Sequence, residues 1–278
     1  MREFFRAARG FADGLRGLDE VMKKHTKSYR KRLFAATAIV LAGIGCARGP
    51  WRTRHRAEFT VHAPRASISD DSLSALADKV VRASADVHKR LEVIEHIDAD
   101  IYFVASREEL TRLTGQRGGG RTDVATGKIF MVNNAKVHPA VHHELGHLLS
   151  WRIWGQPVLE WVNEGVAVDA VRGCDGKSLH EWASAFDQEN RLIPLQDLEH
   201  RFSFADINAV LEGGSVVQYV REQYGMNALL RLWHHGLAEF ARSVGRTEPQ
   251  IEQEWLAVVR AHSPSPELRN RHGPINCE

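Results

Sequence analysis

Two histidines and a glutamate in the middle of the chain have the types and spacing needed to hold a metal ion. They occur in the run H-E-L-G-H over residues 143–147. Residues i and i+4 of an α-helix share one face, so the imidazoles of His143 and His147 can bind one ion from the same side. Glu144 follows the first histidine directly, where its carboxylate can reach water bound to that ion. The spacing therefore predicts a metal-binding helix.

A third ligand is predicted 17 residues beyond His147, at Glu164. This glutamate lies in an otherwise apolar stretch, where a buried carboxylate without a partner would be costly. Coordination of a metal supplies that partner. Two histidines and one glutamate are a standard set for catalytic zinc, because they leave a fourth position open for water. We therefore expect His143, His147 and Glu164 to bind Zn²⁺, with the chain turning between two helices near residues 155–157.

Both motifs resemble those of the gluzincin metallopeptidases. HExxH followed by Trp-x-Asn-Glu-Gly-x-Ala, here residues 161–167, is similar to the clan that includes thermolysin and the aminopeptidase N family. The layout of residues 58–262 resembles the peptidase MA-like family. The resemblance implies peptide hydrolysis by a zinc-activated water. It also implies that Glu144 is the general base, which takes the proton of the water and later passes it to the leaving amine.

One position departs from this resemblance. Relatives carry a tyrosine that donates a hydrogen bond to the oxyanion, and alignment on Gly213-Gly214-Ser215 places Val210 there. Loss of one such donor typically lowers the rate about 10²–10³-fold. A relative's aspartate four residues after the ligand glutamate is also displaced, to Asp169. The side chains that can replace the tyrosine are Tyr219 and His235, with Tyr224 and His234 as further candidates.

Two other functions stay open. The first is a zinc-binding pseudo-peptidase or scaffold lipoprotein without catalysis, which Val210 favours. Glu144 favours the enzyme, because a purely structural zinc site more often closes its fourth position with a protein ligand. The second is a peptidoglycan-directed zinc hydrolase, in which this ligand spacing is uncommon.

The resemblance also assigns a substrate-binding strand. In gluzincins the strand just before the metal-binding helix presents an edge to an extended peptide, which adds to the sheet through backbone hydrogen bonds. Here that strand is expected at Lys128–Val132, with Ile129, Phe130 and Met131 as the substrate-binding residues.

The surrounding pattern predicts an α+β fold. A small N-terminal sheet with helices would pack on a mainly helical C-terminal half, with the zinc site between them. Apolar residues three or four apart predict a helix over 71–94, capped by Asp70 or Asp71. The other expected elements are strands at 58–62, 101–104 and 128–132, a helix at 107–113, a glycine-rich turn at 117–121, and helices from 139 onward.

Charge is distributed unevenly along the chain. Residues 1–56 carry 14 Lys and Arg against 4 Asp and Glu, whereas residues 57–278 carry 23 against 31. The acidic balance of the longer part argues against a nucleic-acid-binding surface. Basic residues followed by an apolar run over 33–45 are typical of a signal peptide. That run has 13 residues, fewer than the roughly 20 of a membrane-spanning helix.

Residues 1–45 are therefore expected to be an extension and signal peptide, with Met22 as an alternative start. Cys46 follows in a context that resembles a bacterial lipobox, which implies lipidation; a signal anchor is the alternative. The protein would be exported to the bacterial cell envelope and act in the periplasm or outside the cell. We expect a tether at 46–57, the peptidase domain at 58–262 and a tail at 263–278. Cys174 and Cys277 either form a disulfide or remain two buried thiols.

Overall fold

The computed structural model describes residues 49–204, 206–268 and 277. The chain divides into two units, Met1–Gly49 and Pro50–Glu278, and the description below concerns the second. The expected signal peptide and Cys46 lie outside the described residues.

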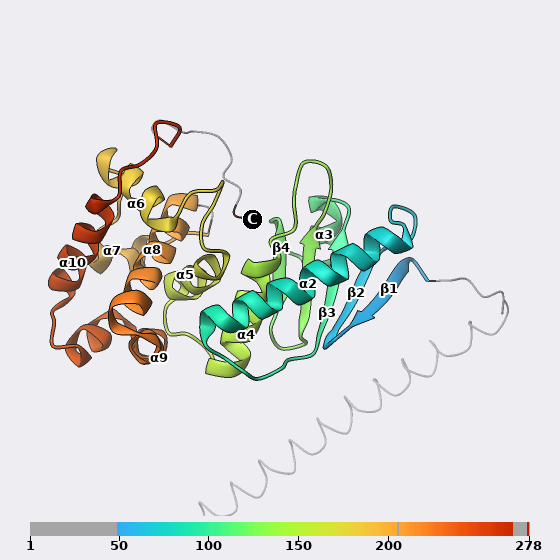
Figure 1. Ribbon diagram of the computed structural model, residues 1–278, viewed down its shortest axis with the longest axis horizontal. Helices are drawn as coiled ribbons and strands as arrows, with labels where there is room; N and C mark the ends of the chain where they lie inside the picture. The colour runs from blue at the N-terminus through green and yellow to red at the C-terminus, as the bar shows by residue number, and fades with distance from the viewer. Residues whose placement is uncertain (1–48, 205, 269–276, 278) are drawn as a thin grey trace, which may run out of the picture. The chain divides into compact units, whose positions relative to one another are not determined.

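A five-stranded mixed sheet forms the N-terminal half of this unit (Figure 1). Its strands lie in the order β1-β2-β3-β5-β4. The three central strands β2, β3 and β5 are parallel, and β1 and β4 pair antiparallel at the two edges. The bounds are β1 Trp51–Arg56, β2 Phe59–Pro64, β3 Ala99–Val104, β4 Gly120–Asp123 and β5 Lys128–Val132.

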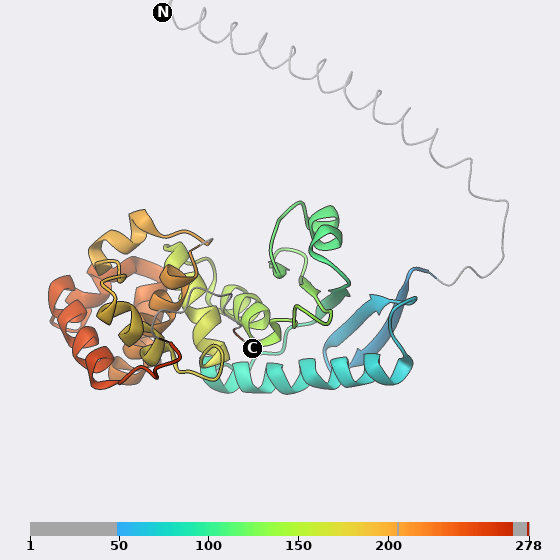
Figure 2. The same cartoon turned by 90° about the horizontal axis from the view of Figure 1, so that it is seen from above.

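Two helices cover the sheet on opposite faces (Figure 2). The long helix α2, Asp70–Leu91, crosses from β2 to β3 and buries one apolar stripe against the sheet. Its N-cap is Ser69, not the expected aspartates, because the Ser69 hydroxyl accepts a hydrogen bond from the backbone N–H of Ser72. Helix α3, Arg107–Thr114, lies on the other face and buries Leu110 against strands β3 and β5.

The C-terminal half is helical, which confirms the predicted α+β class. Helix α5 is central, since it packs against α4 on one side and α8 on the other. The sheet, α2 and most of these helices share one apolar core. The helices are α4 Val141–Trp154, α5 Glu160–Val171, α6 Leu179–Gln188, α7 Leu195–Arg201, α8 Ile207–Tyr224, α9 Met226–Ser243 and α10 Glu248–Ala261. Within the described ranges, no helix combines the length and apolarity needed to cross a bilayer.

Two expectations about these segments need correction. Residues 51–56 were expected in a tether, but they form β1, which pairs along its whole length with β2. The glycine-rich run at 117–121 was expected to be only a turn, yet Gly120 begins strand β4. Of the expected tail, the structure describes residues 263–268 and 277: Leu268 is buried, and Cys277 forms a disulfide with Cys174, one of the two states expected for these cysteines.

Candidate metal centre

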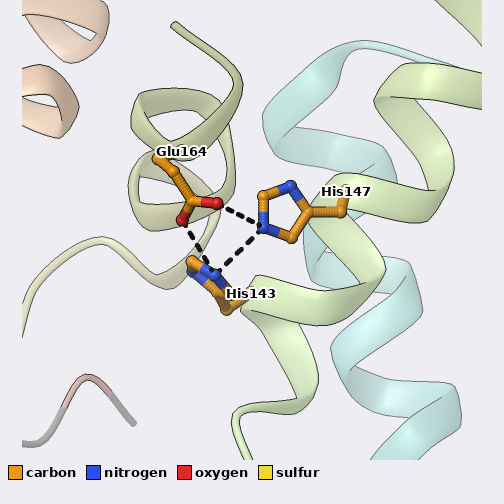
Figure 3. A group of neighbouring side chains, drawn as sticks. All are labelled: His143, His147 and Glu164. Carbon is orange, nitrogen blue, oxygen red and sulfur yellow. Dashed lines mark hydrogen bonds and ion pairs between the residues drawn. The ribbon is translucent and has the colours of Figure 1, made fainter. Parts of the chain in front are cut away.

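Three side chains from two adjacent helices converge on one point (Figure 3). His143 and His147 project from the first two turns of α4, and Glu164 projects toward them from α5. The Nε2 atoms of the two imidazoles are 3.1 Å apart. Glu164 Oε2 lies 3.4 Å from Nε2 of His143, and Glu164 Oε1 lies 3.4 Å from Nε2 of His147. Among the described residues, His143, His147 and Glu164 form the one group of three or more His, Cys, Asp or Glu side chains whose ligand atoms are close enough to hold a metal ion.

These separations fit one tetrahedral zinc ion. Zinc binds imidazole nitrogen and carboxylate oxygen at about 2.0–2.2 Å, so neighbouring ligand atoms around a tetrahedron lie about 3.3–3.6 Å apart. The observed 3.1–3.4 Å are close to this range. A close approach of the two helices makes this possible. At Gly146 a Cβ atom would lie 3.0 Å from the Ala167 backbone, so glycine lets α5 pack directly on α4 beside the ligands.

Asn163 orients one of the imidazoles. Its Oδ1 lies 3.1 Å from Nδ1 of His147 and accepts a hydrogen bond of 2.7 Å from the indole N–H of Trp151. Because an indole nitrogen only donates, the shared atom is an acceptor, and Nδ1 of His147 carries its proton. Nε2 of His147 is therefore the nitrogen directed at a metal. Such outer hydrogen bonds fix the ring and strengthen metal binding.

The electrostatics of the group favour a cation. Burial by itself lowers the pKa of His147, but the nearby carboxylates of Glu164 and Glu144 raise it to about 9. Burial conversely raises the pKa of Glu164, but the imidazoles of His147 and His143 hold it well below its usual range. The negative potential of two carboxylates thus stabilises positive charge at Nε2, whether that charge is a proton or a metal ion.

Glu144 lies beside the ligand group and contacts the sheet. Its side chain is buried, with 5% of its surface exposed. The hydroxyl of Thr122, on β4, donates to Glu144 Oε2 at 2.6 Å. A carboxylate outside this group is therefore held where the sheet meets α4. This agrees with the expected place of the site between the two halves of the fold.

The structure does not bring the expected oxyanion donors to this group. The Tyr219 hydroxyl donates to Glu254 of α10 and also lies 3.4 Å from the Tyr224 hydroxyl. His235 is exposed on α9, with its ring beside that of His234. No hydrogen bond or ion pair between described residues joins Tyr219 or His235 to the ligands. Their catalytic assignment stays a prediction.

Strand β5 is not the edge that was expected. It is hydrogen-bonded to β3 on one side and β4 on the other, so its backbone groups are already paired. Ile129 and Met131 are fully buried, and the partly buried Phe130 stacks on Tyr102. The edge strand that packs against α4 is β4. A substrate role for Ile129, Phe130 and Met131 therefore loses its structural basis.

Asp169 also has another role. It is 1% exposed and forms ion pairs with Arg90 of α2 and Arg221 of α8, at 2.6 and 2.9 Å. It holds three helices together, while Asn163 orients His147 in its place. Neither Asn163 nor Thr122 is among the site residues expected from the sequence. The sequence position of Asn163, directly before the expected ligand Glu164, could have indicated its role. Nothing in the sequence around Thr122 indicated a contact with Glu144.

Comparison with known proteins adds little to this geometry. No protein-family model matches the sequence, and no curated protein matches it. Among solved structures, the chain is similar to a mutant M1 zinc metallopeptidase from Deinococcus radiodurans bound to a Tyr-Ser-Ala substrate. The identity is 18% and the TM-score is 0.39, over 83% of this chain and 54% of that one. This chain thus spans about half the length of that peptidase.

Proposed function

We propose that the protein is a zinc-dependent peptidase that cleaves peptide bonds with a metal-activated water. The observation that supports this is that four buried or partly buried side chains lie together and only three of them would bind the metal. His143, His147 and Glu164 converge and would hold the ion, while Glu144 lies beside them without joining them. A structural site has no need of a carboxylate beside the ligands that does not itself bind the metal.

The chemistry follows from these positions. Zinc, when bound, lowers the pKa of its water toward about 7 and polarises the scissile carbonyl. Glu144 accepts the proton that the water loses on attack, and it later delivers that proton to the leaving amine nitrogen. General acid–base catalysis of this kind contributes on the order of 10²–10⁴-fold. Asn163 keeps the His147 ring in its ligating orientation through both steps.

We propose that the peptide binds at β4. This strand pairs with β5 on one side and ends the strand order on the other, so its outer backbone groups are free to pair with an extended chain. Thr122 on the same strand contacts Glu144. A peptide added to this edge would therefore run past the general base.

A zinc-binding scaffold without catalysis is the second candidate. It is favoured by the position of Tyr219, whose hydroxyl is engaged by Glu254 on α10. Val210, where relatives carry the oxyanion tyrosine, packs in an apolar cluster with the disulfide. Both candidates fit an oxidising compartment, because the Cys174–Cys277 disulfide would not persist in a reducing cytosol. Export and a lipid anchor at Cys46 are proposed on the sequence alone.

Glu144→Gln separates the two functions. The variant should keep zinc and fold, and lose peptide hydrolysis by at least about 10²-fold on a broad peptide pool. Glu160→Gln is the matched control, since Glu160 is exposed at the start of α5 and outside the ligand group. His143→Ala, His147→Ala and Glu164→Ala should each abolish zinc binding, measured by elemental analysis. Equal activity of wild type and Glu144→Gln would instead favour the scaffold.

A further inference from the structure

Strand β4 holds the carboxylate of Glu144 by one oxygen. The Thr122 hydroxyl lies 2.6 Å from Glu144 Oε2 and 3.0 Å from the Glu144 backbone oxygen. A hydroxyl has one proton, and it forms its shorter and stronger bond to the charged acceptor. Thr122 is 7% exposed and Glu144 is 5% exposed, so water competes little for this bond. The hydroxyl therefore fixes which way the carboxylate plane faces.

The same strand also shapes the space around the second oxygen. A Cβ atom built on Gly120 would lie 2.1 Å from Glu144 Oε1 and 2.8 Å from its carboxyl carbon. Real Cβ atoms do not approach other atoms so closely. The absence of a side chain at the start of β4 is thus what admits the carboxylate.

We propose that Thr122 is a positioning residue for the general base and that Gly120 provides the gap into which the base fits. This inference rests on the proposed function. With Oε2 bound by the Thr122 hydroxyl, Oε1 is the oxygen that takes the proton of the water and returns it to the leaving amine. Thr122 keeps its own proton throughout. The edge strand that is proposed to bind the peptide thereby also sets the orientation of the base.

Removing the hydroxyl tests this assignment. Thr122→Val keeps the shape of the side chain and suits a strand, so the fold and zinc content should be retained. Loss of a hydrogen bond to a charged group should lower kcat about 10- to 100-fold with KM nearly unchanged. Thr122→Ser restores the donor and should recover most of kcat. Thr126→Val is the matched control, because the Thr126 hydroxyl donates to Asp123 on the same hairpin, at 2.6 Å.

Filling the gap is the second test. In Gly120→Ala the new methyl group should displace the flexible end of Glu144, which lowers kcat by a similar factor without unfolding the protein. Gly119→Ala is its control, since nothing lies within 4 Å of a Cβ atom there. The melting temperature and zinc content of each variant are measured alongside activity. Loss of zinc by Thr122→Val would make Thr122 merely structural and overturn the inference.

A probe that needs no turnover distinguishes this inference from the proposed function. Acetohydroxamate chelates zinc and must give up a proton, which a carboxylate beside the metal can accept. Calorimetry on the zinc-loaded protein should show about 10-fold weaker binding for Thr122→Val and little change for Thr122→Ser. If that pattern appears while wild type cleaves no peptide, the positioning role stands and the peptidase assignment fails. If wild type shows zinc-dependent cleavage and Thr122→Val matches its kcat, the positioning role is wrong.

Discussion

Zinc affinity should rise steeply with pH, because the ion has to displace a proton from His147. The two adjacent carboxylates raise the pKa of His147 to about 9 in the metal-free protein. The imidazole is therefore protonated at pH 7, and only its deprotonated form can bind metal. Below a pKa of 9 the deprotonated fraction falls about tenfold for each pH unit. Affinity should thus fall about 100-fold from pH 8 to pH 6, which corresponds to about 2.7 kcal/mol.

The assay is competition with a chelator of known affinity at pH 6, 7 and 8. Calorimetry in buffers of different ionisation enthalpy should show release of about one proton from His147 for each ion bound at pH 7. Glu144→Gln removes one of the carboxylates that raise this pKa, so its affinity should depend less on pH. Glu160→Gln should behave as wild type. Affinity that stays flat from pH 6 to pH 8, with no proton release, would refute the electrostatic argument.

Two further predictions concern other contacts in the domain, and a third concerns the proposed lipid anchor. Asn163→Leu removes the acceptor for the ligand imidazole and should weaken zinc binding about 10- to 100-fold, whereas Asn163→Asp should not. Burial raises the pKa of Glu212 to about 8, so between pH 4.5 and 8 the unfolded chain loses a proton that the folded state keeps. Unfolding free energy should therefore fall by on the order of 4 kcal/mol over that range relative to Glu212→Gln, measured in urea. Cys46→Ser should move the protein from the membrane fraction to a soluble exported fraction, and retention after a salt wash would disprove lipid anchoring.

Local periodicity was sufficient to predict the histidine pair. An α-helix fixes the geometry of residues four apart, so His143 and His147 had to share a face once α4 formed. Strand β5 was also predicted at its observed bounds, because its five residues include several apolar side chains that favour a strand. These features depend on contacts within one element, and a single sequence contains that information.

The edge strands could not be predicted in this way. In β1, arginines alternate with other residues, and this local sequence by itself predicts a basic tether. In the fold Arg52 and Arg56 pair with Asp70 and Asp78 of α2, at 2.7 and 3.1 Å. Strand β4 is short and begins with glycine, a residue that is unfavourable in strands. Strand β4 pairs with β5, and its Thr122 side chain contacts Glu144, which is 22 residues away along the chain. A pattern within four residues contains no information about that contact.

The same contrast holds within the candidate metal centre, between the contacts made by α4 and α5 alone and the contacts that involve the sheet. Successive residues of a helix point about 100° apart, so Glu164 can face the ion while Asn163 reaches the far nitrogen of His147. Both positions follow from one helix, α5, lying against α4, and neither needs the sheet. Orientation of Glu144 does need the sheet, because Thr122 and Gly120 come from its outermost strand. The group that could hold a metal and the contacts that orient Glu144 are therefore structurally separable. We predict that substitutions in β4 lower the turnover of the proposed peptidase and leave zinc affinity nearly intact.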